Sequence, residues 1–154
     1  MTVVAVSLLW AACSVAETAG PLSAPLQAPI QIERGKGFAL RVGESAQSAD
    51  GALRIGFDGV SADSRCPTGE QCVWAGDASV RIWLQQGAGP RERREMRVAP
   101  GASPSSAALP GRDLELRLLR LEPYPVSGKA VDPAAYVLTL VLAPGSGSGA
   151  AADR

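Results

Sequence analysis

Alternation of apolar and polar residues restricts the fold of this chain more than any other feature of its sequence. Phe38, Leu40 and Val42 share one parity, and residues 53–57 and 72–84 repeat the pattern. Such alternation is typical of β-strands with one buried face, because successive side chains point to opposite sides of a sheet. Gly- and Pro-rich segments separate these stretches. The sequence therefore predicts short antiparallel strands and not the strand–helix repeats of a parallel sheet.

The segment DLELRLLRLEP, residues 113–123, contains a change of parity. Leucines at positions 114, 116 and 118 alternate, whereas Leu119 and Leu121 fall on the other parity. A β-bulge near Leu118 would preserve a strand through this change. A helix is the alternative, since Leu114, Leu118 and Leu121 also fit helical spacing. We expect the strand because its neighbours are strands.

Two further segments complete the pattern. Met96 and Val98 predict a short strand after a turn segment at 85–95. Residues 135–142 are apolar on both parities, which predicts a strand that is buried on both faces or paired centrally.

These strands predict one all-β domain over residues 30–143. Its expected architecture is a single antiparallel β-sandwich or open barrel of six to seven strands with one disulfide. Residues 17–29, which are rich in Pro, Ala and Ser, predict a flexible tether, and residues 144–154 predict a disordered tail. With 154 residues the chain has room for one domain of ordinary size.

The N-terminus predicts export. The apolar run 3–12 is shorter than a membrane span and has the length of a signal-peptide core. Residues 1–16 are then a signal peptide that is cleaved after Ala16. Alternatively, residues 1–12 are a lipoprotein signal that ends before Cys13, which would be lipidated. Both interpretations place the mature chain in the bacterial cell envelope, lipid-anchored or secreted. A third interpretation is that the apolar run is an N-terminal strand, buried or frayed, of a cytoplasmic protein.

Cys66 and Cys72 are predicted to form a structural disulfide. They enclose five residues, among them Pro67 and Gly69, and disulfides persist in the compartment that the leader predicts. A redox pair would normally show two intervening residues at a helix N-terminus, and a zinc site would need further ligands. Trp74 shares the parity of Cys72, so we expect it to pack beside the bridge and shield it.

Asp63 and Arg65 flank this bridge and admit two interpretations. They could form an exposed recognition pair for a charged partner. More simply, Asp63 accepts backbone N–H bonds in a turn and Arg65 pairs with it or with another carboxylate. We expect the second arrangement.

The segment DSRCPTGEQCVWAG, residues 63–76, resembles a motif, DSRCPxxxxCxWAG, of a poorly characterised family of small bacterial secreted proteins and lipoproteins. The matching residues are Asp63, Ser64, Arg65, Cys66, Pro67, Cys72, Trp74, Ala75 and Gly76. The LxxLEPYP segment at 118–125 and the strand that contains Tyr136 fit the family more loosely. The resemblance implies export and a β-rich domain and supplies no activity. We therefore expect a structural role for the motif residues Asp63, Arg65, Pro67, Trp74 and Gly76.

The composition lowers the prospects for catalysis. The chain has no histidine, which removes Ser-His-Asp and Cys-His chemistry and the usual histidine-containing metal sites. Its 15 basic and 15 acidic residues cancel, so nucleic acid is not an expected partner. In PRERRE, residues 90–95, glutamates offset the arginines, as at a solvated hairpin end. No cofactor and no metal are expected.

Several carboxylates could in principle act as catalytic or calcium-binding groups. A glycosidase pair could be drawn from Asp113, Glu115, Glu122 and Asp132, which show no defining spacing. Calcium ligands could be drawn from Asp50, Asp58 and Asp63, which form no EF-hand pattern and are equally well explained as turn residues.

Taken together, the sequence predicts an exported, non-enzymatic β-domain, lipid-anchored in the envelope, that binds an unidentified protein or envelope component. Loops 64–71, 99–112 and 123–133 are the expected contact segments. Trp83 lies opposite the Trp74 face, where we expect a second layer to cover it in preference to an exposed binding patch. The alternative function is an envelope-associated hydrolase or a thiol-redox accessory.

Overall fold

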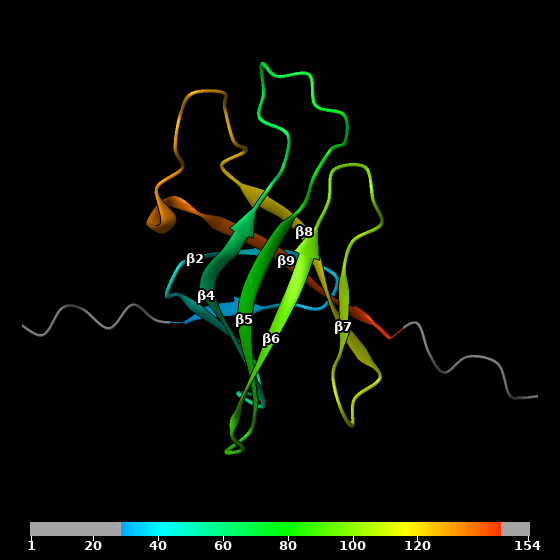
Figure 1. The fold of residues 1–154 in the computed structure, drawn as a ribbon. Helices are drawn as coiled ribbons and strands as arrows, with labels where there is room; N and C mark the ends of the chain where they lie inside the picture. The colour runs from blue at the N-terminus through cyan, green and yellow to red at the C-terminus, as the bar shows by residue number, and fades with distance from the viewer. Residues whose placement is uncertain (1–28, 146–154) are drawn as a thin grey trace, which may run out of the picture.

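The computed structural model describes residues 29–145, and these form two β-sheets with a shared core (Figure 1). The strands are β1 (Ile30–Ile32), β2 (Gly37–Arg41), β3 (Ser45–Ser48), β4 (Leu53–Asp63), β5 (Ala78–Gln86), β6 (Arg91–Val98), β7 (Ser106–Ala108), β8 (Leu114–Glu122) and β9 (Val137–Pro144). One 3-10 turn, η1 (Pro133–Ala135), precedes β9. The described part of the chain contains no α-helix.

The sheets have the orders β1-β3-β4-β5-β6 and β2-β9-β8-β7, and neither closes into a barrel. The second sheet is antiparallel throughout, whereas β1 runs parallel to β3 and makes the first sheet mixed. The expectation of a purely antiparallel sheet is therefore wrong at this edge. The expected six to seven strands were also too few, because β1, β3 and β7 have only three or four residues, too short for an alternation signal.

The alternating residues of the sequence build the core. Inward-facing side chains of β4 and β5 are fully buried against those of β8 and β9. Among the largest are Phe57, Leu40, Leu53, Ile55, Ile82, Leu116, Leu138 and Leu140. Burying each such side chain contributes roughly 1.5–3 kcal/mol relative to leaving it exposed.

The change of parity in residues 113–122 is resolved as a strand with a bulge. The register between β8 and β9 shifts between Leu118 and Arg120, so Leu118 and Leu121 both face the core. The predicted bulge is confirmed and the helical alternative is wrong. The predicted central position of the last strand is also confirmed, since β9 lies between β2 and β8.

Two strand boundaries differ from the prediction. The strand expected from Cys72 onward begins only at Ala78, because residues 64–77 leave the sheet as a loop. The turn predicted at 85–95 is confined to residues 87–90, because β5 extends to Gln86 and β6 already begins at Arg91. The short strand predicted from Met96 and Val98 is confirmed as the end of β6, whereas the charged residues before them line an edge strand and gave no alternation signal. The predicted leader, Cys13 and most of the tether and tail lie outside the described residues.

Candidate functional site

Three loops lie together at one end of the sandwich, at the top of Figure 1. They are residues 64–77 between β4 and β5, residues 99–105 between β6 and β7, and residues 123–132 between β8 and η1. We call these three segments the loop end. Each of them overlaps a predicted contact segment, and the chemistry-bearing residues of the DSRCP motif lie here.

The motif first builds the base of the loop 64–77. Ser64 N–H donates to the Asp77 carbonyl at 2.8 Å, and Cys66 N–H donates to the Ala75 carbonyl at 2.9 Å. These bonds continue the β4–β5 pairing beyond the sheet. Gly76 is buried, has φ +69°, and lies so close to Ser64 that a Cβ atom there would overlap the Ser64 carbonyl oxygen. The glycine is therefore required by both conformation and space.

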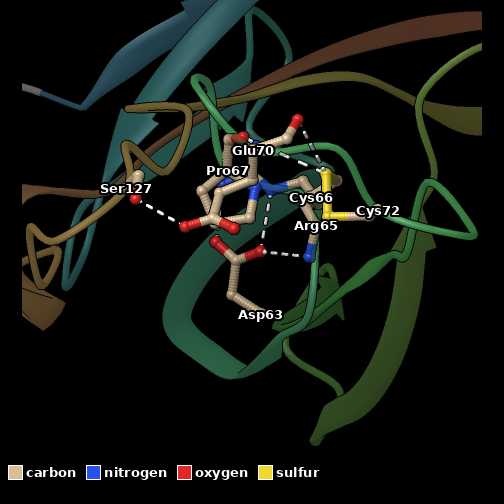
Figure 2. The surroundings of a disulfide bond; sticks show 7 residues. All are labelled: Asp63, Arg65, Cys66, Pro67, Glu70, Cys72 and Ser127. Carbon is tan, nitrogen blue, oxygen red and sulfur yellow. Dashed lines mark hydrogen bonds and ion pairs between the residues drawn. A yellow bond between two sulfur atoms is a disulfide. The ribbon is translucent and has the colours of Figure 1, made fainter.

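Cys66 and Cys72 form the predicted disulfide, which closes the tip of this loop (Figure 2). The prediction that Trp74 packs beside the disulfide and shields it is wrong. Residues 72–77 are not part of a strand, so parity does not place Trp74 beside the bridge, and Cys72 and Trp74 are both exposed. The disulfide therefore lies at the surface of the protein.

A second set of bonds attaches this loop to the segment 123–132. Thr68 N–H donates to the Pro125 carbonyl at 2.9 Å, and Ser127 N–H donates to the Thr68 carbonyl at 3.1 Å. The Ser127 hydroxyl also donates to the Glu70 carboxylate at 2.5 Å (Figure 2). The loop is therefore braced at its base, across its tip and along one side.

Arg65 connects the two sheets beneath these loops. Its side chain is only 3% exposed, and two of its guanidinium nitrogens donate to the Asp63 carboxylate at 2.8 and 2.6 Å. The guanidinium also donates to the carbonyls of Leu121, at 2.7 Å, and Pro123, at 3.0 Å. Asp63 ends β4 of the first sheet, whereas Leu121 lies in β8 of the second, so one side chain joins both layers.

The Asp63–Arg65 pairing agrees with the simpler of the two interpretations, and the backbone N–H of Arg65 also donates to Asp63. Tyr136 is a member that sequence reasoning missed; its hydroxyl donates to Asp63 at 3.0 Å from a position 73 residues along the chain. No spacing in the sequence indicates a contact of that range. Its only signals in the sequence were the loose fit of its segment to the family and its place just before an apolar strand.

The network sets the ionisation of its members. Burial raises the pKa of Asp63, but hydrogen bonds from the Arg65 side chain and backbone, the Arg65 charge and the Tyr136 hydroxyl outweigh it, so the pKa lies below its usual value. Burial and the bond to the Asp63 carboxylate raise the pKa of Tyr136. Asp63 is therefore an anion held by its partners and not a carboxyl tuned for proton transfer.

Next to this network lies an open cavity of about 230 Å³. One wall is the loop 99–105, and the other is residues 118–121 of β8, with Arg65 and Tyr124 at the end. The Arg65 guanidinium carbon lies 4.8 Å from the centre of the Tyr124 ring. The loop 99–105 has no charged residue, so this wall of the cavity is uncharged.

Large hydrophobic side chains are exposed mainly at the loop end. Val73 and Trp74 are 103% and 70% exposed, and Tyr124 and Val126 are exposed to lesser degrees. The remaining exposed large hydrophobic of the described residues is Leu119, which lines the cavity.

Other candidates are not brought into a site. Glu115 is buried and pairs with Arg117, whereas Glu122 pairs with Arg120 on the surface. Asp132 accepts the Ala134 N–H at the start of η1. Within residues 29–145 no three His, Cys, Asp or Glu side chains cluster so as to hold a metal ion.

Trp83 lies on the outer face of the first sheet and is half-buried, without the second layer that was expected. Its indole covers Gly56, where a Cβ would overlap the ring, and the Arg91 guanidinium carbon lies 4.1 Å from the ring centre on β6. Neighbours in its own sheet thus cover this side chain.

No known protein family, curated protein or solved structure matches the chain. In the part of the chain that the structure describes, no helix is long and apolar enough for a membrane span.

Proposed function

We propose that this protein is an exported, non-enzymatic β-domain of the bacterial cell envelope, lipid-anchored through Cys13, that binds another protein or envelope component through its loop end. The observation that carries the proposal is the Val73–Trp74 pair. These side chains remain in water although the loop beneath them is fixed by a disulfide and two sets of hydrogen bonds.

A fixed and exposed tryptophan is suited to binding. An exposed indole gains hydrophobic free energy when a partner covers it, and a braced loop loses little conformational entropy in the process. Tryptophan is also among the residues that most often dominate interface energies. Asp63, Arg65 and Gly76 of the motif build the loop and its attachment, whereas the Trp74 side chain is 70% exposed.

Photocrosslinking in the native host tests this proposal. Replacing Trp74 by a photoreactive phenylalanine analogue should give a defined protein or envelope adduct on irradiation. The same analogue at Ala88, an exposed residue in the β5–β6 turn at the opposite end of the sandwich, is the matched control. With the identified partner, Trp74→Ala should weaken binding by about 2 kcal/mol or more, roughly thirtyfold in Kd. Absence of an adduct at 74, or equal adducts at both positions, contradicts the proposal.

The intact mass of the product from native membranes tests the anchor and the compartment. We expect an acylated N-terminal Cys13 and the loss of two hydrogens for the Cys66–Cys72 bond. An untrimmed cytosolic chain with free thiols would contradict export.

Exposure of Cys72 favours one alternative, a thiol-redox accessory. That role predicts that the pair cycles between dithiol and disulfide in the host. Thiol trapping that finds only the disulfide form under all growth conditions would argue against it.

A further inference from the structure

Arginines gather on the outer face of the first sheet, which points away from the core. In Figure 1 the strands β4, β5 and β6 of this sheet lie in front of β8 and β9 of the second sheet. Each arginine has the parity opposite to the buried apolar side chains of its own strand, so it points outward. We call this set the arginine face, and its members are Arg54 in β4, Arg81 in β5, and Arg91, Arg93 and Arg97 in β6.

Alternation within β6 separates charges that nearly balance along the sequence. Of the acidic residues in this strand, only Glu95 shares the outward parity of the arginines. Glu92 lies on the other parity, where its carboxylate accepts a hydrogen bond from Arg94 at 3.1 Å. The segment 90–95 is therefore close to neutral as a sequence but presents mainly arginine on the outer face.

Neighbouring carboxylates offset the arginine face only in part. Arg93 lies 3.7 Å from Asp58, and the arginine side chain is 85% exposed. Arg97 lies 3.6 Å from Asp77, at the margin of the face, and its side chain is 72% exposed. Exposed pairs at these distances are weak because solvent screens them, so both guanidinium groups remain open to another anion.

The remaining arginines of the face have no acidic partner among residues 29–145, where no carboxylate forms an ion pair with Arg54, Arg81 or Arg91. The Arg91 guanidinium carbon lies 4.1 Å from the centre of the Trp83 ring, and that ring covers Gly56. A cation–π contact positions the arginine without neutralising its charge. The face therefore keeps an excess of positive charge on a chain whose net charge is zero.

This arrangement matches a surface of phosphates. Five guanidinium groups stand against three carboxylates, those of Asp58, Asp77 and Glu95. They are spread over three adjoining strands, and none of them lines the cavity at the loop end. A guanidinium binds phosphate through paired, charge-assisted hydrogen bonds, so an extended set of them suits an extended array of anionic groups. A bilayer that contains anionic phospholipid presents such an array.

We propose that the arginine face docks on the phosphate headgroups of an anionic phospholipid bilayer. The inference rests on the proposed envelope location and on the lipid anchor at Cys13. Residues 14–28 join that anchor to the described domain and span at most roughly 55 Å, so the bilayer is within reach. The loop end lies at one end of these strands and not on the arginine face, so docking leaves it free for its partner (Figure 1).

Vesicle sedimentation tests this inference on the oxidised mature chain that begins at Glu17. That chain contains every described residue and has neither the apolar run nor the lipid, so its binding reports on the domain. We expect binding to vesicles of phosphatidylglycerol and phosphatidylcholine in equal parts, and none to vesicles of phosphatidylcholine alone. Raising the salt from roughly 0.05 M to roughly 0.5 M should release the protein, because screening weakens interactions between exposed charges.

The variant Arg81→Gln/Arg91→Gln/Arg93→Gln removes the centre of the face. Each basic residue near an anionic surface contributes roughly fivefold to binding, so this variant should bind the anionic vesicles at least about tenfold more weakly. Urea unfolding checks that the variant retains its fold.

The matched control is Arg34→Gln/Arg41→Gln/Arg120→Gln, which removes the same charge from exposed arginines outside the face. It should retain most of the vesicle binding, and urea unfolding again checks the fold. Equal binding to uncharged vesicles, equal losses in the two variants, or binding that survives high salt would overturn the inference.

An acidic polypeptide is the rival occupant of the arginine face, and soluble polyglutamate is its probe. Polyglutamate that binds through the same arginines, without any binding to vesicles, would assign the face to an acidic protein and would also overturn the inference.

The two proposals fail separately. A photocrosslinked partner at position 74 without vesicle binding would refute only the docking of the arginine face. Vesicle binding that depends on the arginines, without an adduct at position 74, would support docking and refute the role of the tryptophan. An untrimmed cytosolic product would refute export, whereas the vesicle assay would still decide whether the face binds anionic lipid.

Discussion

Replacement of Arg65 by methionine tests whether the buried ion pair holds the two sheets together at the loop end. Methionine retains an unbranched apolar stem of similar length and removes the guanidinium. Asp63 then loses two charged donors at 2.8 and 2.6 Å, and the carbonyls of Leu121 and Pro123 lose theirs. Asp63 keeps the Tyr136 hydroxyl and the backbone N–H of residue 65, which satisfy the carboxylate only in part.

Removing one partner of a buried pair typically costs 3–5 kcal/mol, because the other charge stays buried without compensation. The Asp63 side chain is 11% exposed and keeps a hydroxyl donor and a backbone N–H donor, so we expect the lower end, about 3 kcal/mol. Domains of this size are stable by about 5–15 kcal/mol, so the loss is a large fraction of the total.

Urea unfolding with the disulfide intact measures this cost. The control is Arg93→Met, because Arg93 is exposed and lies 3.7 Å from Asp58, an arrangement worth at most about 1 kcal/mol. The double variant Asp63→Asn/Arg65→Met should be less destabilised than the sum of the two single variants, by about 1 kcal/mol or more. If Arg65→Met costs no more than Arg93→Met, the idea that Arg65 joins the sheets is wrong.

Three further predictions follow from the same region. Because the folded-state pKa of Asp63 is lowered, its stabilising contribution should be complete above about pH 4 and should disappear as the pH falls through the folded-state pKa. Urea titrations at several pH values should therefore show the stabilities of the wild type and of Asp63→Asn converging in acid. Gly76→Ala should destabilise the protein by more than about 2 kcal/mol. The control Gly51→Ala, at a glycine with a similar φ of +68° but open space around it, should cost about 1 kcal/mol. Equal losses in urea unfolding would contradict the close approach at Gly76. Reduction of Cys66–Cys72 should proceed without global unfolding, because Cys72 is exposed, and should lower stability by about 2 kcal/mol; a thiol that appears only in denaturant would refute this surface position.

Much of the sheet structure could be predicted from local pattern. The alternation at 38–42 and 53–57 marked β2 and the start of β4, and the switch of leucine parity marked the bulge in β8. Periodicity works here because a strand with one buried face needs an apolar side chain at every second residue. It fails for β1 and β7, which are too short, and for the charged first half of the edge strand β6, where backbone pairing to β5 places the residues.

The sequence by itself determined that strands would form, where the core residues of the long strands lie, and that Cys66 and Cys72 could close a short loop. These properties depend on residues close together along the chain. Only the tertiary structure decided that Trp74 stands in solvent and that Tyr136 reaches Asp63. The same is true of Arg65, which ends on carbonyls more than fifty residues away. Those contacts depend on how two sheets stack, and stacking is set by the sum of many buried surfaces and by no local pattern.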